Sequence, residues 1–322
     1  MHVHRISDEE IATLMTPADF VASCHMAYQL YGQGEMVNPA RSESLTQEKG
    51  MDVFHLELPG EWLGKYRGKK VIEERSDVKT GRLGDRTAVI SLEDIQSGQQ
   101  VNLDADYITN MRTGAAGVLG AKYVCQLPIR KVAILGTGRI AKALALCADV
   151  ALNPEVICVT SRKETSRIDF AKDMTGKLAC SLQMKDTIES CVMGSDAILA
   201  AVPTPKPILK DEMVSKNTHI SILGGDQRTQ QVAQSLFLSR SIVPDHAKQV
   251  LKSGEFLEAT ASGSTICWVN DGAGQIQNIG HAALGMLENL RGQGVIVYFS
   301  GMAIQDVHAA SVVWERYRGH KM

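Results

Sequence analysis

The sequence predicts an α/β protein in which a parallel sheet follows a segment of α+β character. From residue 131 onward, strand-like and helix-like stretches alternate, beginning with the apolar run KVAIL at Lys131–Leu135. Alternation at this spacing produces right-handed crossovers and a parallel sheet. A glycine-rich turn, residues 136–141 (GTGRIA), follows that run directly. The first hundred residues lack this alternation, so they are expected to form a separate α+β part.

The amino-terminal part is predicted to begin with helix. Residues 7–31 place apolar side chains at helical spacing, Ser7 and Glu10 fit a capping box, and Thr16-Pro17 marks a second helix start. Short strands bounded by glycine turns are expected at 52–58, 69–73 and 86–91. Residues 106–123 are expected to form a helix whose many small residues favour close packing.

The second part is predicted as a run of strand–helix units. Helices are expected at 136–150 and 164–174, and a further helix at 229–238. Strands are expected at 156–160, 178–182, 197–202, 219–223 and 241–243. Residues 254–278 are rich in Gly and Ser and predict a loop, followed by a helix at 281–290, a strand at 295–299 and a last helix at 302–317.

Length and composition narrow the function classes. A chain of 322 residues is expected to hold about two domains of about 150 residues. The net charge of −2 argues against non-specific nucleic-acid binding, and 44% hydrophobic residues argue against disorder. No apolar stretch approaches membrane-spanning length and no signal peptide is visible, so no membrane partner and a cytoplasmic location are expected. The seven scattered cysteines contain no CxxC pair, so neither disulfides nor a metal site is expected.

The turn after KVAIL predicts dinucleotide binding and hence a Rossmann-type domain. Its pattern is GxGxxA between a strand and a helix: Gly136 permits the tight turn, Gly138 lets a pyrophosphate approach the backbone, and Ala141 permits close helix–strand packing. The helix start then offers N–H groups and a positive dipole to the phosphates. The competing interpretation is an ordinary strand–helix turn with glycines for geometry alone.

The end of the second strand favours NADP(H) over NAD(H). NAD-binding domains usually have Asp or Glu there to bind the ribose hydroxyls. Here the strand runs into Ser161, Arg162 and Lys163, with no carboxylate. A hydroxyl and two cations suit a 2′-phosphate, which a carboxylate would repel. NAD(H) remains the alternative cofactor, and a solvated basic turn is the interpretation without function.

Four stretches in the same order carry a family resemblance. They are LDAD at 103–106 leading to TNMRTGAA at 109–116, the glycine turn 23 residues later, ILGGD at 222–226, and SGMAIQD at 300–306. Together they resemble the ornithine cyclodeaminase/mu-crystallin family over most of the chain. The chain departs from the family's pattern after Lys70, because residues 72–83 contain neither Pro nor Asn. That loop helps to define the family's substrate pocket, so the resemblance does not name the substrate.

The resemblance implies a discontinuous architecture and nominates site residues. Residues 1–112 and 301–322 would form an α+β substrate-binding and dimerisation domain of a homodimer, and residues 113–300 the Rossmann NAD(P)-binding domain. Substrate binding maps onto Arg41, Lys70 and Arg112, with Lys69 as the rival of Lys70, and catalysis onto Lys70 and Asp226. The cofactor-binding set that we expect is Thr113, Gly136, Thr137, Gly138, Arg139, Ile140, Ser161, Arg162, Lys163, Val202 and Ser300.

The residue types fit amino-acid or imino-acid chemistry. Asp226 follows a buried strand at the carboxyl edge of the predicted sheet, where it can bind an ammonium or act as a general base; capping the 229–238 helix is the structural alternative. Arg41 and Arg112 can clamp a carboxylate, and Lys70 can polarise an imine or exchange a proton. Outside such a site, these cations would be ordinary surface charges.

Three functions therefore compete. The first is an NAD(P)H-dependent oxidoreductase acting on C–N bonds, either a ketimine or imino acid reductase or an amino acid dehydrogenase, with a small amino or imino acid as substrate. The second is a cyclodeaminase of ornithine or a related diamino acid, which releases ammonia with tightly bound NAD and needs a carboxylate for the distal ammonium. Candidates for that carboxylate are Glu57, Glu61, Glu73 and Glu74. The third is a non-catalytic NADPH- and ligand-binding protein of the mu-crystallin type.

Overall fold

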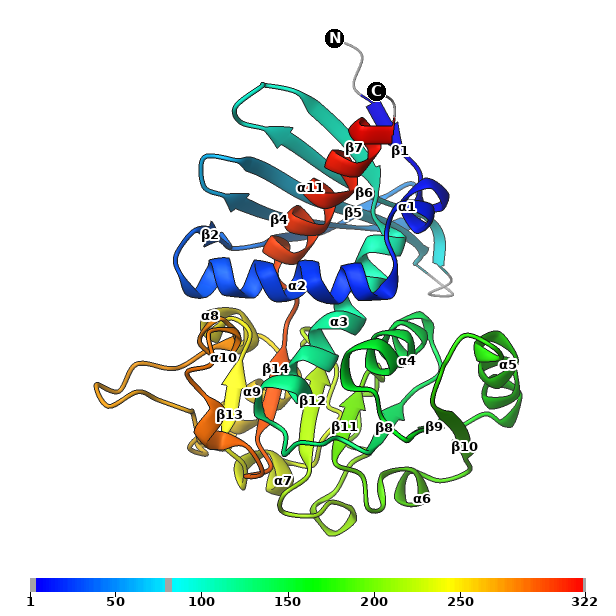
Figure 1. Cartoon of the computed structure of the whole chain (residues 1–322), viewed down its shortest axis with the longest axis vertical. Coiled ribbons are helices and arrows are strands. Elements are labelled where there is room, and N and C mark those ends of the chain that lie inside the picture. Colours follow the sequence, from blue (N-terminus) through cyan, green and yellow to red (C-terminus); the bar gives the residue numbers. More distant parts are fainter. Residues whose placement is uncertain (1–3, 79–82, 321–322) are drawn as a thin grey trace. The chain divides into compact units, whose positions relative to one another are not determined.

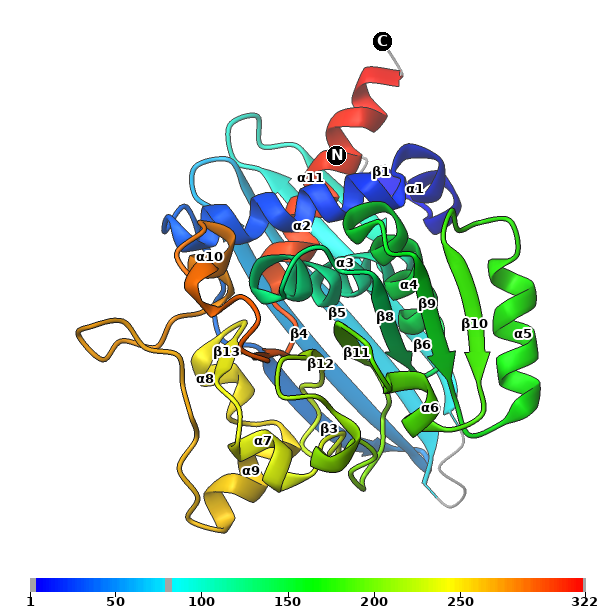
Figure 2. The same cartoon turned by 60° about the horizontal axis from the view of Figure 1, so that its bottom comes forward.

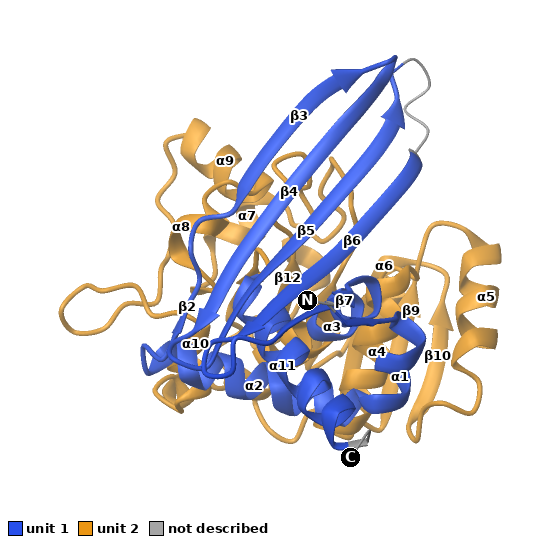
Figure 3. Cartoon of the chain, turned by 90° about the horizontal axis from the view of Figure 1, so that it is seen from above, with its two compact units in different colours: residues 1–112, 302–322 blue, residues 113–301 orange. Residues whose placement is uncertain are grey.

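The computed structural model describes residues 4–78 and 83–320, and the chain divides into two compact units (Figure 3). Unit 1 comprises residues 1–112 and 302–322, and unit 2 comprises residues 113–301. The first boundary falls inside helix α3 (Asp106–Val124), and the second lies just before helix α11 (Ala303–His320). The predicted α/β fold class is confirmed: one unit holds a mixed sheet and the other an all-parallel sheet.

Unit 1 is built on a mixed seven-stranded sheet of order β1-β7-β6-β5-β4-β2, with β3 paired to β4. All neighbours are antiparallel except β1 and β7. Three strands of 12 residues each dominate it and extend well beyond the short strands predicted here (Figure 3). The strands are β1 (His4–Ile6), β2 (Met36–Val37), β3 (Ser42–Glu48), β4 (Met51–Trp62), β5 (Tyr66–Asp77), β6 (Leu83–Asp94) and β7 (Gln100–Asp104).

Two capped helices open unit 1. α1 (Asp8–Leu14) and α2 (Pro17–Gly32) both start with a capping box, at Ser7 with Glu10 and at Thr16 with Asp19. Each box satisfies two backbone N–H groups that a helix start leaves without partners. The predicted capping signals at Ser7 and Thr16 are therefore confirmed, and they divide the expected helix 7–31 into two.

Helix α11 packs directly on the sheet of unit 1 because two glycines leave room for it. A Cβ on Gly60 of β4 would lie 3.1 Å from the backbone carbon of Ala303, and one on Gly68 of β5 would lie 2.9 Å from Cγ2 of Val307. Side chains alternate across a strand, so Gly68 and Lys70 share the face toward α11. The close approach at Gly68 thus brings Lys70 next to the start of α11.

Unit 2 contains seven parallel strands in the order β10-β9-β8-β11-β12-β14-β13 (Figure 1). The chain proceeds from β8 to β9 on one side and returns to β11 on the other, so the strand order reverses between β8 and β11. In such sheets, ligands bind outside the carboxyl ends of the strands at this reversal. The strands are β8 (Lys131–Leu135), β9 (Val156–Thr160), β10 (Ser181–Lys185), β11 (Ala197–Ala200), β12 (His219–Leu223), β13 (Ile242–Pro244) and β14 (Ile296–Phe299).

Helices cover both faces of this sheet (Figure 2). On one face, an apolar cluster joins the strands to α6 (Ile188–Val192), α7 (Gln234–Leu238) and α9 (Gly254–Ala261). On the other face, α3 packs on α4 (Arg139–Leu152), where a Cβ on Gly114 would lie 2.6 Å from the carbonyl carbon of Ala143. The small residues predicted to favour close packing therefore lie at this contact. The remaining helices are α5 (Glu164–Met174), α8 (Ala247–Val250), α10 (Ile279–Ala283), and the 3₁₀ turns η1 (Asp211–Met213) and η2 (Glu288–Leu290).

Several element predictions were wrong in unit 2. Residues 254–278 are not all loop, because α9 begins at Gly254. The helix expected at 229–238 begins only at Gln234, and the one expected at 281–290 is broken by Gly285, whose φ is +79°. A positive φ interrupts helical hydrogen bonding and favours glycine. Within the described part of the chain, no helix is both long and apolar enough to cross a membrane.

Candidate functional site

Strand β5 places its two adjacent lysines on opposite faces of the sheet. The Lys70 side chain is 1% exposed and lies on the face toward α11, where its Nζ is 2.8 Å from Oδ2 of Asp306. The Lys69 side chain is 45% exposed and its Nζ is 3.0 Å from Oε1 of Glu57. Alternation along the strand therefore gives one lysine a buried site and the other a surface ion pair.

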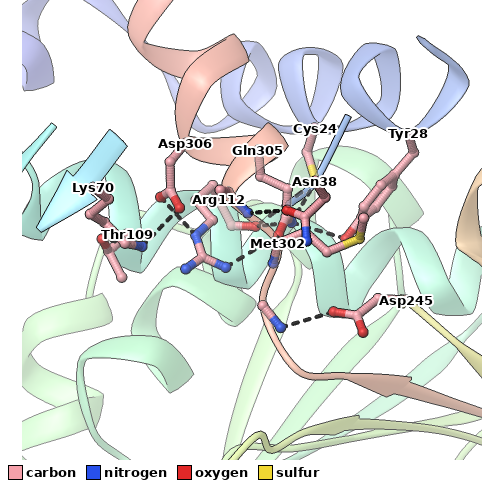
Figure 4. A network of polar contacts seen from close by, with 12 residues as sticks. Cys24, Tyr28, Asn38, Lys70, Thr109, Arg112, Asp245, Met302, Gln305 and Asp306 are labelled. Carbon is pink, nitrogen blue, oxygen red and sulfur yellow. Dashed lines mark hydrogen bonds and ion pairs between the residues drawn. The ribbon is translucent and has the colours of Figure 1, made fainter. Parts of the chain in front are cut away.

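Lys70, Arg112 and Asp306 form a buried cluster in unit 1 (Figure 4). Asp306 holds both cations, because Nε of Arg112 donates to its Oδ1 at 3.1 Å while Lys70 pairs with its Oδ2. Lys70 also donates to Oγ1 of Thr109 at 3.3 Å. The Asp306 side chain is 1% exposed and that of Arg112 8%. Two cations and one carboxylate leave the cluster with one excess positive charge.

Burial tunes the proton affinity of Lys70. Desolvation is the largest cause, and with the neighbouring charge of Arg112 it lowers the pKa of Lys70 to about 8, against the opposing effect of Asp306. A lysine with such a pKa exchanges its proton near neutral pH, whereas an ordinary lysine stays protonated. The cluster therefore contains a cation that can also act as a proton donor.

Gln305 fixes the orientation of Arg112 (Figure 4). Its Oε1 accepts from Nη1 of Arg112 at 3.2 Å and from the backbone N–H of Met302 at 3.1 Å. Its Nε2 donates to the hydroxyl of Tyr28 at 2.9 Å. The guanidinium is thus bound on two sides by consecutive residues of α11, Gln305 and Asp306.

Arg41 lies in unit 1, in the loop before β3. Its Nε is 2.8 Å from Oε1 of Glu43, and its side chain is 13% exposed. The family resemblance groups Arg41 with Lys70 and Arg112, and its ion pair in this structure is with Glu43 in the adjacent strand. Its role in substrate binding stays a prediction.

The glycine turn of unit 2 has the geometry of a phosphate-binding loop. Gly136 has a φ of +108°, and a Cβ there would lie 3.1 Å from the carbonyl oxygen of Ala201, so the position favours glycine. A Cβ on Gly138 would meet open space, and no side chain caps the start of α4 at this residue. Thr137, Arg139 and Ile140 complete the turn. The start of α4 therefore has free space next to it and no side-chain cap, and it lies where the strand order reverses. These features fit the binding of a dinucleotide phosphate.

The end of β9 is basic, as the sequence indicates. β9 ends at Thr160, and the exposed Arg162 and Lys163 follow the partly buried Ser161. Sequence reasoning missed Arg167, whose Nη1 donates to the carbonyl of Ser161 at 2.7 Å and whose Nη2 pairs with Asp186 at 2.9 Å. Arg167 lies one turn into α5, so only the packing of that helix places it here.

Asp226 lies in the turn after β12 and does not cap a helix. Its Oδ1 accepts from the backbone N–H of Arg228 at 2.8 Å, and the guanidinium of Arg228 contacts both carboxylate oxygens, at 2.8 and 3.1 Å. The carboxylate is 45% exposed. The cap proposed as a structural alternative does not form, because α7 starts at Gln234. Arg228 was not anticipated from the sequence.

The other predicted cofactor residues lie at strand or helix ends. Val202 follows β11, and its backbone N–H donates to Oε1 of Gln231 at 2.8 Å. Ser300 follows β14, and its hydroxyl donates to Oδ1 of the buried Asp245 at 2.7 Å. Thr113 is the residue after Arg112 in α3. Across residues 4–78 and 83–320, no group of His, Cys, Asp and Glu is arranged to hold a metal ion.

Comparison with known proteins identifies the family. The model of the ornithine cyclodeaminase/mu-crystallin family matches residues 3–321. The chain belongs to this family. It is 27% identical over 320 residues to an alanine dehydrogenase of Archaeoglobus fulgidus, covering 96% of this chain and 94% of the relative. It is 22% identical over 321 residues to a Delta(1)-pyrroline-2-carboxylate reductase of Bacillus cereus, covering 97% and 95%.

Solved structures share the fold over the whole chain. The Thermococcus litoralis Delta(1)-pyrroline-2-carboxylate reductase, in complex with NADH and L-proline, has a TM-score of 0.85 at 20% identity and 99% coverage of both chains. An archaeal alanine dehydrogenase dimer with bound NAD has a TM-score of 0.82 at 23% identity, covering 100% of this chain and 98% of that one. The family resemblance inferred from the four sequence stretches is confirmed.

Proposed function

We propose that this protein is an oxidoreductase that uses a nicotinamide cofactor to reduce the C=N bond of a small imino acid or to oxidise the corresponding amino acid. The observation that carries the proposal is the buried cluster of Lys70, Arg112 and Asp306, which has one excess positive charge. A buried unpaired charge is costly, so the cluster favours an anionic ligand. The carboxylate of an imino or amino acid is such a ligand.

We assign different steps of the reaction to different residues according to their chemistry. Arg112 and Lys70 bind the carboxylate, with Asp306 and Gln305 holding both cations in place. Lys70, with a pKa near 8, can also supply a proton at neutral pH. Asp226 is proposed to bind the substrate nitrogen or exchange its proton, in place of its present partner Arg228. Bound at the turn of Gly136 and Gly138, the cofactor would supply the hydride.

We propose NADP(H) as the preferred cofactor. The support is the basic end of β9, where Ser161, Arg162 and Lys163 follow the strand and Arg167 lies against Ser161. A 2′-phosphate gains from these cations. The relatives with NADH or NAD in their structures make NAD(H) the alternative, and a direct comparison of both cofactors tests it.

The cyclodeaminase alternative is less well supported by the contacts of unit 1. It requires a carboxylate for a distal ammonium, and each of the four glutamates considered for that role is already paired with a cation. Their partners are Lys69 for Glu57, Arg67 for Glu61, Arg75 for Glu73 and Arg86 for Glu74. An incoming ammonium would have to displace one of these cations.

The experiment is a substrate and cofactor panel followed at the reduced-nicotinamide absorbance. Purified protein is mixed with NADPH or NADH and with pyrroline-2-carboxylate, and in parallel with pyruvate plus ammonia or methylamine. We expect loss of the absorbance with an imino acid, faster with NADPH. Ammonia release from ornithine or lysine without net change in absorbance would support the cyclodeaminase instead. Tight cofactor binding without turnover of any of these compounds would support the binding-protein alternative.

A further inference from the structure

A buried glutamine joins the carboxyl ends of two neighbouring strands in unit 2. Gln231 is 0% exposed and lies between β12 and α7. Its Oε1 accepts from the backbone N–H of Val202, beyond the end of β11, at 2.8 Å. Its Nε2 donates to the carbonyl of Leu223, the last residue of β12, at 2.9 Å. Strands β11 and β12 are direct neighbours, and this side chain ties them together where their ladder ends.

The two contacts match the chemistry of a carboxamide. One strand end presents an N–H and the other a C=O, so the linking side chain must accept at one atom and donate at the other. Asn and Gln offer both functions in one planar group that carries no charge. Asn is shorter by one methylene group. An apolar residue at position 231 would leave both of these part-buried backbone groups without their partner, which is costly.

Gln231 is itself held in place by a second buried layer. Its backbone N–H donates to Oε1 of Glu255 at 2.7 Å, and Oε2 of Glu255 accepts from the hydroxyl of Tyr298 at 2.7 Å. Both partners are 0% exposed. The carbonyl of Gln231 accepts from the backbone N–H groups of Ile208 and Leu209. The side chain is therefore fixed by its own backbone and by residues of α9 and β14.

The carboxyl ends of β11 and β12 are each followed by a residue to which we assign a role in the reaction. Val202 is in the predicted cofactor-binding set and follows Ala201, whose carbonyl lies against Gly136. Leu223 precedes the Gly224-Gly225 turn that presents Asp226. The hydroxyl of Tyr298 would lie 2.4 Å from a Cβ on Gly224, so this turn rests on the same buried layer.

We propose that Gln231 is a positioning residue, which sets the placement of the cofactor-binding turn at Val202 relative to the turn that presents Asp226. The proposal rests on the proposed function, because it assigns to Gln231 the alignment of hydride donor and catalytic carboxylate. A misplacement of about 1 Å can lower a rate by about 100-fold. Loss of Gln231 should therefore affect turnover more than binding.

Thr218 provides a matched control at the opposite ends of the same strands. Its hydroxyl donates to the carbonyl of Ser195 at 2.9 Å, and it is 5% exposed. Ser195 precedes β11 and Thr218 precedes β12, so this hydrogen bond joins the amino ends as Gln231 joins the carboxyl ends. Thr218→Val removes a buried hydrogen bond between the same two segments without touching the predicted site.

The first test uses the full chain without substrate. Hydrogen–deuterium exchange is measured in Gln231→Met, Thr218→Val and wild type on a peptide that contains Val202. Pro203, Pro205 and Pro207 have no amide hydrogen, so the Val202 amide contributes a large share of the deuterium uptake of this peptide. We expect Val202 to exchange about tenfold faster or more in Gln231→Met, because its part-buried hydrogen bond is lost, and at the wild-type rate in Thr218→Val. Unchanged exchange in Gln231→Met would overturn the proposal.

The second test separates alignment from general damage. In steady state with NADPH and pyrroline-2-carboxylate, Gln231→Met should lower kcat by about tenfold or more while the KM for the imino acid stays within about threefold. Thr218→Val should keep the wild-type kcat. Equal losses of kcat in both variants would show that any lost hydrogen bond between these strands has the same effect, and would overturn the proposal. If Gln231→Met does not fold, Gln231→Asn, which keeps the polarity but cannot reach both partners, should show the same pattern.

The proposed function and the positioning role fail in different ways. A wild-type protein that reduces no imino acid contradicts the proposed function. The exchange experiment needs no substrate and then still tests the positioning role. A Val202 exchange rate in Gln231→Met that equals the wild-type rate overturns it.

Discussion

Replacing Asp306 with asparagine tests the buried cluster on which the proposed function depends. The variant keeps the size of the side chain and removes the charge that Lys70 and Arg112 share. At 2.8 Å and an effective dielectric constant of about 20, the attraction between Lys70 and Asp306 is about 6 kcal/mol before desolvation is counted. Removing one partner of a buried pair typically costs about 3–5 kcal/mol, and we expect Asp306→Asn to lose that much stability.

Denaturant unfolding measures this loss, with Asp104→Asn as the matched control. Asp104 pairs with Arg5 at 2.7 Å in the same unit, but the two side chains are 25% and 71% exposed. Exposed pairs contribute about 0–1 kcal/mol, so the control should stay close to wild type. Equal and small losses in both variants would refute the view that the cluster is a buried, strongly coupled group.

The same variant changes the pH dependence of substrate binding. Asp306 raises the pKa of Lys70 against the effects of burial and Arg112, so its removal lowers that pKa below about 8. A lysine is cationic only below its pKa, so wild-type kcat/KM should fall as the pH rises through about 8. In Asp306→Asn this fall should begin at lower pH. A pH profile of kcat/KM that does not move would contradict the assignment of Lys70 as the carboxylate-binding cation.

Three further predictions address unit 2. Asp226→Asn should lower turnover by orders of magnitude and leave NADPH affinity near wild type; unchanged turnover in the steady-state assay would remove its catalytic role. Arg162→Ala should weaken NADPH much more than NADH in fluorescence titrations, and equal effects would remove the argument for NADP(H). Gly136→Ala places a side chain at a φ of +108° and should cost about 1–3 kcal/mol in unfolding experiments, whereas Gly138→Ala, at a φ of −78°, should be close to neutral. Equal stability of the two glycine variants would contradict the strained turn.

Much of unit 2 could be predicted because its strands are buried on both faces. Runs such as KVAIL at Lys131–Leu135 are apolar after their first residue, and three strands, β8, β9 and β12, have the predicted bounds. The long strands of unit 1 were predicted too short, because residues such as Glu61 and Arg67 point away from α11 and form surface ion pairs. Such polar residues at the ends of these strands resemble the polar residues of turns. Helix α9 was missed because its first residue is glycine.

Individual residues of the candidate site could be proposed from the sequence, but the contacts between them could not. The sequence left Lys69 and Lys70 as rivals, since neighbouring lysines are equivalent until the packing of α11 on Gly68 assigns the faces. Asp306 lay in a quoted motif, but it is 194 residues from Arg112, and no local pattern indicates a contact over that separation. Arg228 and Gln231 are likewise placed by turns whose path depends on tertiary packing.

The proposed function depends above all on binding of the substrate's carboxylate by the buried cluster around Lys70. The most direct test compares kcat/KM for pyrroline-2-carboxylate and for pyrroline, which lacks the carboxylate, in wild type, Lys70→Met and Lys69→Met. We predict a strong preference for the carboxylate in wild type and Lys69→Met, and its collapse in Lys70→Met. Retention of the preference in Lys70→Met, or its equal loss in both variants, would contradict carboxylate binding by Lys70.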